Sequence, residues 1–213
     1  DEITRDIVRE AYQTHHYRYD RGGEEHYNTI SAFIKSVRGS DPDAAVYYLA
    51  RMLEAGEGPK FIARRLIILA SEDVGNAEPY ALTLATAAFT AVDYVGLPEA
   101  SLILAQAATF LSGCPKSNAS YMAINAALSE VRKRPGVAIP MHLRNAPTKL
   151  MKEIGYGRDY KYSHDSEDHF IEQDFLPDAL RDKIFYEPTE IGREAAIKKY
   201  LEQKWKKRGK KDK

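Results

Sequence analysis

One cysteine, Cys114, is all that the sequence offers for disulfide chemistry, so no disulfide framework can form within one chain. Such sparing use of cysteine is typical of proteins from a reducing compartment. An excess of charge of either sign is also absent, because Lys plus Arg and Asp plus Glu both number 31. The composition of the whole chain therefore provides no overall field that would indicate nucleic-acid binding.

Long apolar runs are absent as well. The least charged region, residues 79–115, is interrupted by Asp93, Gly96, Pro98 and Glu99. No run in it reaches the roughly 18 apolar residues that read as a membrane-spanning helix. A signal peptide is not recognisable at the beginning. The sequence therefore predicts no membrane-spanning segment and no membrane partner.

Phosphate-binding glycine loops are missing too. The sequence contains neither GxxxxGK[ST] nor a GxGxxG that follows a strand, so we expect no ATP site and no bound cofactor in this chain. An initial methionine is also lacking, and the first residues, DEITRDIVREAY, read as a helix entered near its beginning. We therefore expect the chain to be a fragment of a longer protein.

Helical periodicity dominates what is present. Asp41, Asn76 and the pair Ser117-Asn118 are placed to cap the helices that follow them, and Gly75 is placed to end a helix. Apolar residues recur three or four positions apart, which predicts helices. The predicted helices cover about residues 3–12, 27–37, 42–55, 59–75, 78–95, 98–112, 119–133, 147–154 and 189–207. No strand is predicted, so the expected fold class is all-α.

The stretch PKFIARRLIILASEDVG, residues 59–75, is apolar on almost every side after Arg65, which is typical of a buried helix. Glu72 and Asp73 fall in its last turn, where the helix dipole disfavours anions. Arg64 and Arg65 lie too far along the helix to pair with them. Both charged pairs therefore need partners from other elements. Two interpretations stay open: a structural ion-pair network between helices, or an arginine that reaches a subunit boundary or a ligand.

Alanine is dense between residues 81 and 108. Small residues let helix axes approach closely, and the apolar residues here occupy several helix faces. That is more apolar surface than one small core needs. We therefore predict that the helical hairpins at 78–131 form a subunit interface as well as a core.

The segment HLRNAPTK, residues 142–149, offers two cations, an imidazole and amide donors just before a predicted helix start, a place that attracts anions. It either cradles a phosphate or a partner's carboxylate, or it caps the helix and forms a salt bridge, for example to Glu72 or Asp73. The full candidate anion or partner surface comprises Lys116, Asn118, His142, Arg144, Asn145, Lys149, Arg158 and Lys161.

Beyond Gly155 the helical period is lost, and residues 156–188 are rich in aromatic and turn residues. We expect an ordered arm whose rings either pack against the helical body or, together with Arg158 and Lys161, stack on nucleic-acid bases. After Trp205 the sequence carries six cations and one anion. This basic tail either adds nonspecific phosphate contacts or is a solvated terminus.

Catalytic and metal-binding constellations are weak. His164-Asp165 and Asp168-His169 could supply metal ligands from one loop, but their spacing matches no familiar site, so no metal is predicted. Cys114 lacks an identifiable histidine partner and is read as a small buried side chain. No pairing of a base with a nucleophile can be argued from the spacing, so no catalytic residue is predicted for this chain.

Several segments together resemble the C-terminal portion of one family, from about Ile3 to Glu194. That family is the MgsA/RarA ATPases, replication-associated recombination proteins related to the Werner-helicase-interacting protein and, within the AAA+ class, to clamp loaders. The segments are HYNTISAFIKSVRGSDPDAAVYYLARMLEAGE, PKFIARRLIILASEDVG, CPKSNASYMAINAAL, MHLRNAPTKLMKEIGYG, FLPD and FYEPTEIGRE.

The resemblance implies a cytoplasmic DNA-dependent ATPase that acts at stalled or damaged replication forks and assembles as a tetramer, with replication proteins as further partners. In that family the motor that binds ATP and Mg precedes the region present here. The helical C-terminal region joins the subunits, as the collar does in clamp loaders. The Walker motifs and sensor arginines of the motor have no counterpart in this sequence, so no catalytic residue of the family can be assigned.

We therefore predict a helical-hairpin bundle that resembles a clamp-loader collar, followed by an irregular aromatic-rich arm and a final helix. Residues 1–25 are expected to hold the end of a lid-linked helix and a connector, residues 26–77 an AAA-associated helical region, and residues 78–213 an oligomerisation domain. The predicted function is a non-catalytic oligomerisation and scaffold region of an AAA+ ATPase in replication-fork maintenance, recombination and DNA repair. The alternative is a module that binds DNA or a protein tail through the HLRNAPTK segment, the arm and the basic tail.

Overall fold

The structure, a computed structural model of the 213-residue chain, describes residues 4–5 and 24–205. Every regular element in this part of the chain is helical, which confirms the predicted all-α fold class. The helix predicted at 3–12 lies outside the described residues except for Thr4 and Arg5. Among the described residues, none of the helices combines the length and the apolar character needed to cross a membrane.

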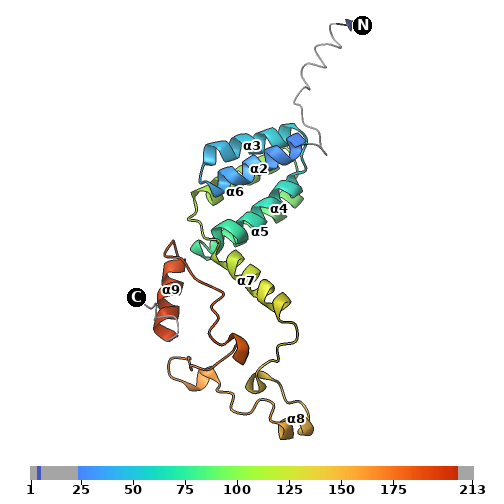
Figure 1. Ribbon diagram of the computed structural model, residues 1–213. Helices are drawn as coiled ribbons and strands as arrows, with labels where there is room; N and C mark the ends of the chain where they lie inside the picture. The colour runs from blue at the N-terminus through green and yellow to red at the C-terminus, as the bar shows by residue number, and fades with distance from the viewer. Residues whose placement is uncertain (1–3, 6–23, 206–213) are drawn as a thin grey trace. The chain divides into compact units, whose positions relative to one another are not determined.

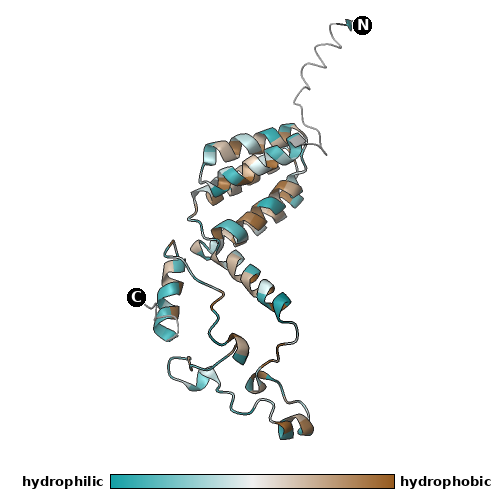
Figure 2. Cartoon of the chain, viewed as in Figure 1, coloured by the Kyte–Doolittle hydropathy of each residue, from teal (hydrophilic) through white to brown (hydrophobic). Residues whose placement is uncertain are grey.

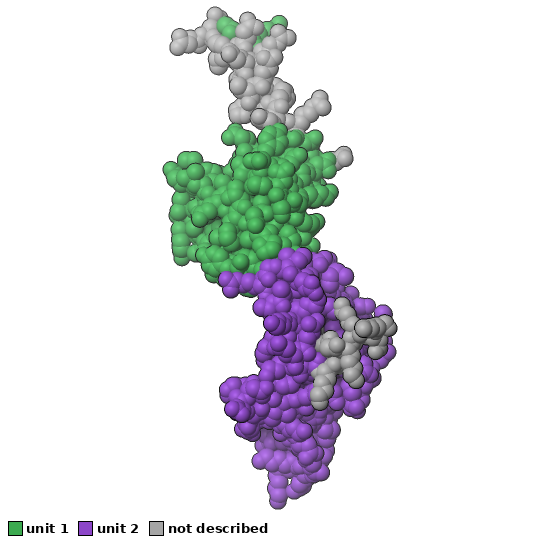
Figure 3. Space-filling view, turned by 90° about the vertical axis from the view of Figure 1, so that its left-hand side faces the viewer, with its two compact units in different colours: residues 1–116 green, residues 117–213 purple. Residues whose placement is uncertain are grey.

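The chain divides into two compact units, residues 1–116 (unit 1) and residues 117–213 (unit 2), shown in separate colours in Figure 3. The division predicted after residue 77 falls inside unit 1, where α5 (Tyr80–Val95) packs against α4 (Pro59–Leu69) and against the turn that follows α4. Residues before and after position 77 therefore share one hydrophobic core.

Unit 1 is a bundle of helices joined by short turns (Figure 1). Helix α6 is central, because it contacts each of the other described helices of the unit. The helices are α2 (Glu24–Arg38), α3 (Pro42–Glu54), α4 (Pro59–Leu69), α5 (Tyr80–Val95) and α6 (Ala100–Gly113). Each of these helices was predicted, but α2 begins three residues earlier than predicted, α5 and α6 begin two residues later, and α4 ends before Gly75.

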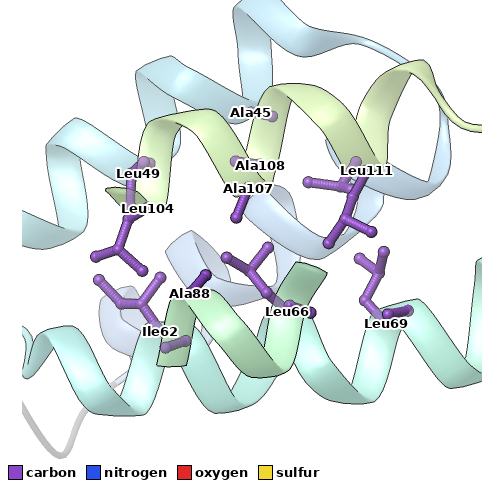
Figure 4. Packing of buried hydrophobic residues seen from close by; sticks show 14 of the residues in the cluster. Ala45, Leu49, Ile62, Leu66, Leu69, Ala88, Leu104, Ala107, Ala108 and Leu111 are labelled. Atoms are coloured by element: carbon purple, nitrogen blue, oxygen red, sulfur yellow. The ribbon is translucent and has the colours of Figure 1, made fainter. Parts of the chain in front are cut away.

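The core of unit 1 forms where α4 faces α6. Ile62, Leu66 and Leu69 of α4 point toward Leu104 and Leu111 of α6 in Figure 4. Alanines fill the narrow spaces between these larger side chains, which allows the helices to pack closely. The buried alanines shown with them are Ala45, Ala88, Ala107 and Ala108.

The end of α4 differs from the prediction of one helix over 59–75. The helix widens into a π-helical turn over Ala70–Val74, and a 3-10 turn over Gly75–Ala77 follows. Gly75 has a φ of +52°, a conformation that suits glycine and ends the helical path. The extra residue of a π turn changes which side chains face the core, and such turns often mark functional positions.

Of the three predicted helix caps, one is confirmed, one is wrong and one is confirmed in part. The Asp41 side chain accepts a hydrogen bond from the backbone N–H of Ala44 at 2.9 Å, which confirms the first cap. Asn76 lies inside the 3-10 turn, and the carboxylate of Glu78 accepts from the N–H of Tyr80 instead. In the predicted pair Ser117-Asn118, the Asn118 side chain does not cap α7 (Ala119–Lys133), whereas Oγ of Ser117 accepts a hydrogen bond from the N–H of Ala119 at 3.3 Å.

Unit 2 begins with α7 (Ala119–Lys133) and ends with α9 (Glu194–Lys204), with the short α8 (Lys149–Ile154) between them. The hydrophobic colouring recurs along α7 in Figure 2, whereas its last turn is hydrophilic. Both α8 and α9 begin later than predicted. The arm between them contains only turns and short 3-10 segments, as its lost periodicity indicates.

Aromatic rings fix the arm to the end of α9. The ring of Trp205 receives Phe170 and Phe175 edge-on, at centroid distances of 5.4 and 6.2 Å. The ammonium of Lys204 lies 5.6 Å from the Phe170 ring centroid. Part of the arm therefore packs against the end of α9 in its own unit, while other rings remain exposed. Packing of the arm against the helical body stays a prediction.

Candidate functional site

The acidic pair at the end of α4 finds its cation on α2. Nε of Arg38 donates to Oδ1 of Asp73 at 2.5 Å, and Nη2 of Arg38 lies 3.7 Å from Oε1 of Glu72. The sequence reasoning missed Arg38. The predicted participation of Arg64 and Arg65 is not seen: within the described residues neither forms an ion pair, and Arg64 instead lies against the Phe61 ring, 5.9 Å from its centroid.

Two buried polar atoms near these charges have no hydrogen-bond partner among the described residues. They are Oδ2 of Asp73 and Nε of Arg65. Asp73 is only 8% exposed, and removing its carboxylate from water costs free energy. The ion pair between Oδ1 of Asp73 and Arg38 offsets this cost. The ion pair joins α2 to the π turn, which is a structural role.

Lys116 is also used structurally rather than as a free cation. Its ammonium donates to Oγ of Ser40 at 3.0 Å and to the carbonyl oxygens of Ser112 and Cys114 at 3.0 and 2.6 Å. These bonds use all three donors and satisfy carbonyls at the end of α6. Burial lowers the pKa of Lys116, with Cys114 and Asp73 acting in the opposite direction.

Cys114 should react slowly with a thiol reagent in the folded protein. The residue is buried, and this burial raises the pKa of its thiol above the ordinary value. Because the thiolate is the nucleophile, we expect labelling at pH 8 to be at least about tenfold slower than for the chain unfolded in urea. Equal rates in the two states, measured with an aromatic disulfide reagent, would contradict this placement.

The segments around Ser117 and FYEPTEIGRE meet at one buried carboxylate. Glu194, at the start of α9, is completely buried, and its oxygens accept hydrogen bonds from the hydroxyls of Ser117, Thr189 and Tyr186 and from the N–H of Thr189. Burial alone would raise the pKa of Glu194, but these hydrogen bonds outweigh it and the pKa is lowered. The cluster fastens the start of α7 to the start of α9.

The predicted HLRNAPTK segment lines a pocket of about 450 Å³ in unit 2. The imidazole Nε2 of His142 lies 2.7 Å from the carbonyl oxygen of Asp174, which can only accept, so Nε2 carries the proton and Nδ1 faces elsewhere. The pocket-lining residues are His142, Leu143, Arg144, Asn145, Ala146, Gly157, Tyr160 and Phe175. The sequence analysis identified three polar residues of this lining, His142, Arg144 and Asn145. The aromatic rings of Tyr160 and Phe175 come from the arm.

Arg144 is held in place by its own unit. Its Nε donates to the carbonyl of Ile139 at 2.8 Å, its Nη1 donates to the Tyr156 hydroxyl at 3.3 Å, and its guanidinium lies 5.1 Å from the Tyr156 ring centroid. Gly157 must remain small here, because its φ is +72° and a Cβ would lie 3.3 Å from the carbonyl oxygen of Arg144. The pocket wall is therefore fixed by backbone geometry and stacking.

The other predicted surface residues do not join this pocket. Asn118 precedes α7, and Lys149 is highly exposed and lies 4.0 Å from Glu153 on the same helix. The guanidinium of Arg158 lies beside Gly155, and the backbone of Lys161 pairs with the side chain of Gln173. The structure therefore brings together only His142, Arg144 and Asn145 of the predicted set.

The histidine-rich loop of the arm is held by hydrogen bonds. The Nδ1 atoms of His164 and His169 lie 3.2 Å apart, and Asp168 pairs with Lys204 at 2.5 Å. The hydrogen bond from Lys204, followed by that from Ser166, lowers the pKa of Asp168 to about 2. Among the described residues, no group of three or more His, Cys, Asp or Glu side chains is arranged to hold a metal.

Comparison with protein families separates the chain at the end of α2. Residues 39–205 match the family described as MgsA AAA+ ATPase C terminal, and residues 1–38 match an AAA C-terminal domain. The first match covers well over half of the chain. This chain belongs to the MgsA C-terminal family.

Three curated relatives of this MgsA C-terminal chain are named as replication-associated recombination proteins or as an ATPase. It is 46% identical to replication-associated recombination protein A of Haemophilus influenzae. The 201 aligned residues are 94% of this chain and 45% of that protein. It is 48% identical to the protein of the same name from Escherichia coli K12, over 84% of this chain and 40% of that one. It is 45% identical to ATPase WRNIP1 of Dictyostelium discoideum, over 79% of this chain and 19% of that protein.

The MgsA C-terminal chain therefore spans less than half the length of these relatives. Arg38 is the last residue of the AAA C-terminal match, and Asp73 lies within the MgsA match. Their ion pair thus connects the two matched regions within unit 1. The pocket and the cluster around Glu194 both lie within the MgsA match.

Proposed function

We propose that this chain is a non-catalytic scaffold that joins the subunits of an AAA+ ATPase in replication-fork maintenance, recombination and DNA repair. The ATPase activity, with its ATP and Mg, belongs to a motor elsewhere in the parent protein, which acts on DNA in the cytoplasm. The homologues named replication-associated recombination protein A and the match to an AAA+ ATPase C terminal support this assignment. The proposed assembly is a homotetramer, with replication proteins as further partners.

The observation that carries the scaffold proposal is an apolar stripe on α7. Tyr121, Ile124, Leu128 and Val131 are 43%, 55%, 41% and 66% exposed. Their spacing of three, four and three residues places them on one face of the helix, as in the seam of a coiled coil. At about 100° per residue, this face is opposite to the buried Glu130.

A second copy of this chain is the occupant that fits the stripe. Two heptads bury too little surface for a stable interface, which requires roughly 1,200–2,000 Å² in total. Unit 1 separately exposes apolar side chains within the predicted 78–131 interval that a second copy can also bury, namely Leu82, Tyr94, Val95, Leu97 and Leu102. Exposed apolar patches of this kind are typical of protein interfaces.

Sedimentation of the 213-residue chain tests the scaffold directly. We expect a tetramer at micromolar concentration, and we expect Leu128→Glu to shift the equilibrium toward smaller species, because a charge would be buried in the seam. Ser129→Glu, one position along on an exposed part of α7, is the matched control and should leave the tetramer intact. A monomeric parent chain, or equal dissociation by both variants with unchanged helix content, would exclude α7 as the interface.

The pocket in unit 2 favours a second candidate function. It is the predicted alternative of a module that binds DNA or a protein tail, supported by the convergence of His142, Arg144 and Asn145 on one cavity. A titration with DNA at several salt concentrations tests this second function, because an affinity that depends on phosphate contacts falls steeply as the salt concentration rises. Sedimentation measures assembly independently of DNA binding.

A further inference from the structure

The pocket of unit 2 combines aromatic faces with unused polar groups. Tyr160 and Phe175 line it and are 45% and 42% exposed, so their rings are available to a ligand. Leu143, Ala146 and Gly157 supply apolar and backbone surface between them. A volume of about 450 Å³ lies within the range of small-ligand sites, roughly 300–1,000 Å³.

The hydrogen-bonding groups of the pocket decide what chemistry it suits. Within the described residues, Asn145 takes part in no hydrogen bond, so its amide offers both a donor and an acceptor. Arg144 has used Nε and one N–H of Nη1 on Ile139 and Tyr156, so three of its five N–H donors remain for acceptor atoms of a ligand. A mixed donor and acceptor edge beside aromatic faces suits a nucleobase better than a carboxylate.

The charges near the pocket suit a phosphate backbone. Residues 140–161 carry five cations and two anions. Four of these cations, Lys149, Lys152, Arg158 and Lys161, follow the HLRN part of the pocket lining within sixteen residues of the sequence. Other proteins bind single-stranded nucleic acid by this combination of stacking rings and surrounding positive charge.

We infer that this pocket binds an unstacked base of single-stranded nucleic acid, with Tyr160 and Phe175 as stacking faces and Asn145 as a contact to the base edge. This inference deepens the second candidate function by naming the ligand, and it does not depend on the oligomeric state. Cations of the surrounding segment, residues 140–161, bind the phosphates, which fixes the strand without reading its sequence.

The base dependence of binding is measured by fluorescence anisotropy with the 213-residue chain. The probes are a labelled thymidine oligonucleotide of about ten nucleotides and the same strand with every base removed, which carries the same phosphates. We expect the intact strand to bind about 5- to 150-fold more tightly than the abasic one, the effect of one stacked base. We expect Tyr160→Ala to remove this preference.

Two further variants make the test specific. Asn145→Ala should also reduce the preference for the intact strand, and it removes no hydrogen bond within the described part of the chain. Tyr200→Ala, which changes a comparably exposed tyrosine on α9, should leave the preference unchanged. All variants should keep the salt dependence of binding, because no phosphate contact is removed.

Three results would overturn the inference. The first is equal binding of the intact and abasic strands, which would leave phosphate contacts alone. The second is an equal loss from Tyr160→Ala and Tyr200→Ala in variants with native circular dichroism. The third is binding of an acidic peptide with a free carboxyl terminus that Tyr160→Ala abolishes while oligonucleotide binding is unchanged, which would assign the pocket to a protein tail. Tetramer formation measured on the same samples keeps this outcome separate from that of the scaffold proposal.

Discussion

Replacing Leu66 with alanine should lower the free energy of unfolding of this protein by about 3–5 kcal/mol. Leu66 is completely buried in α4 and points into the space between α4 and α6 (Figure 4). Its neighbours there belong to the central helix of unit 1, so they cannot move to fill the cavity without disturbing other contacts. The lost transfer free energy and the remaining cavity therefore add together.

Ile68 on the same helix is the matched control. Its side chain is 44% exposed, so Ile68→Ala removes a side chain of equal size from a much less buried position. We expect a loss of roughly 1 kcal/mol or less. Urea unfolding followed by far-ultraviolet circular dichroism measures both. Equal effects of the two substitutions would contradict the placement of α4 that Figure 4 shows.

The helices of unit 1 were predictable because their signals are local. Periodicity over a few turns and a cap such as Asp41 before Pro42 depend only on residues close in sequence, and the structure reproduces these elements. The π turn at Ala70–Val74 was not predictable in this way. Its apolar pattern continues that of α4, and the contact of its Asp73 with Arg38 of α2 is not indicated by the residues nearby in sequence.

Partners that are distant in sequence account for most of what the sequence could not provide. Arg38 and Asp73 are separated by 35 residues, and Ser117 and Glu194 by 77. A charge such as Glu72 or Asp73 indicates that a partner is needed, but any cation brought near by the fold could supply it. A partner from another element was therefore predicted, but Arg38 of α2 was not identified as that partner.

The candidate pocket was predicted in part for the same reason. His142, Arg144 and Asn145 lie within four residues, so one segment of the sequence identified them. The fold adds Tyr160 and Phe175, because the arm returns to this segment and is held there by contacts such as that of His142 with Asp174. The loss of helical periodicity beyond Gly155 indicated an irregular arm but not its path.

Replacing Glu194 with alanine should destabilise unit 2 by about 3–5 kcal/mol. The substitution leaves a cavity and removes the acceptor of hydrogen bonds from Ser117, Thr189 and Tyr186. Buried donors without an acceptor incur the full cost of their desolvation. Glu202→Ala, at an exposed position of the same α9, should change stability by about 0.5 kcal/mol or less.

Trp205 provides the measurement for unit 2. It is the single tryptophan of the chain, and its ring packs against Phe170 and Phe175 of the arm, so its fluorescence reports whether this unit is folded. Urea unfolding of the two variants, followed at this residue, gives the difference in free energy. A Glu194→Ala transition that coincides with that of Glu202→Ala would show that the buried carboxylate does not fasten α9 to α7.

The pH dependence of the same transition tests the charge of Glu194 separately from its shape. The hydrogen bonds lower its pKa in the folded protein below the ordinary value of 4.5. The ionised carboxylate therefore stabilises the fold fully above about pH 4.5, and this contribution is lost as the pH falls through the folded-state pKa. Glu194→Gln keeps the size of the side chain but does not titrate, so the stability of that variant should decrease less steeply in this range. Parallel decreases for the parent chain and for Glu194→Gln would mean that other carboxylates dominate the acid sensitivity of unit 2.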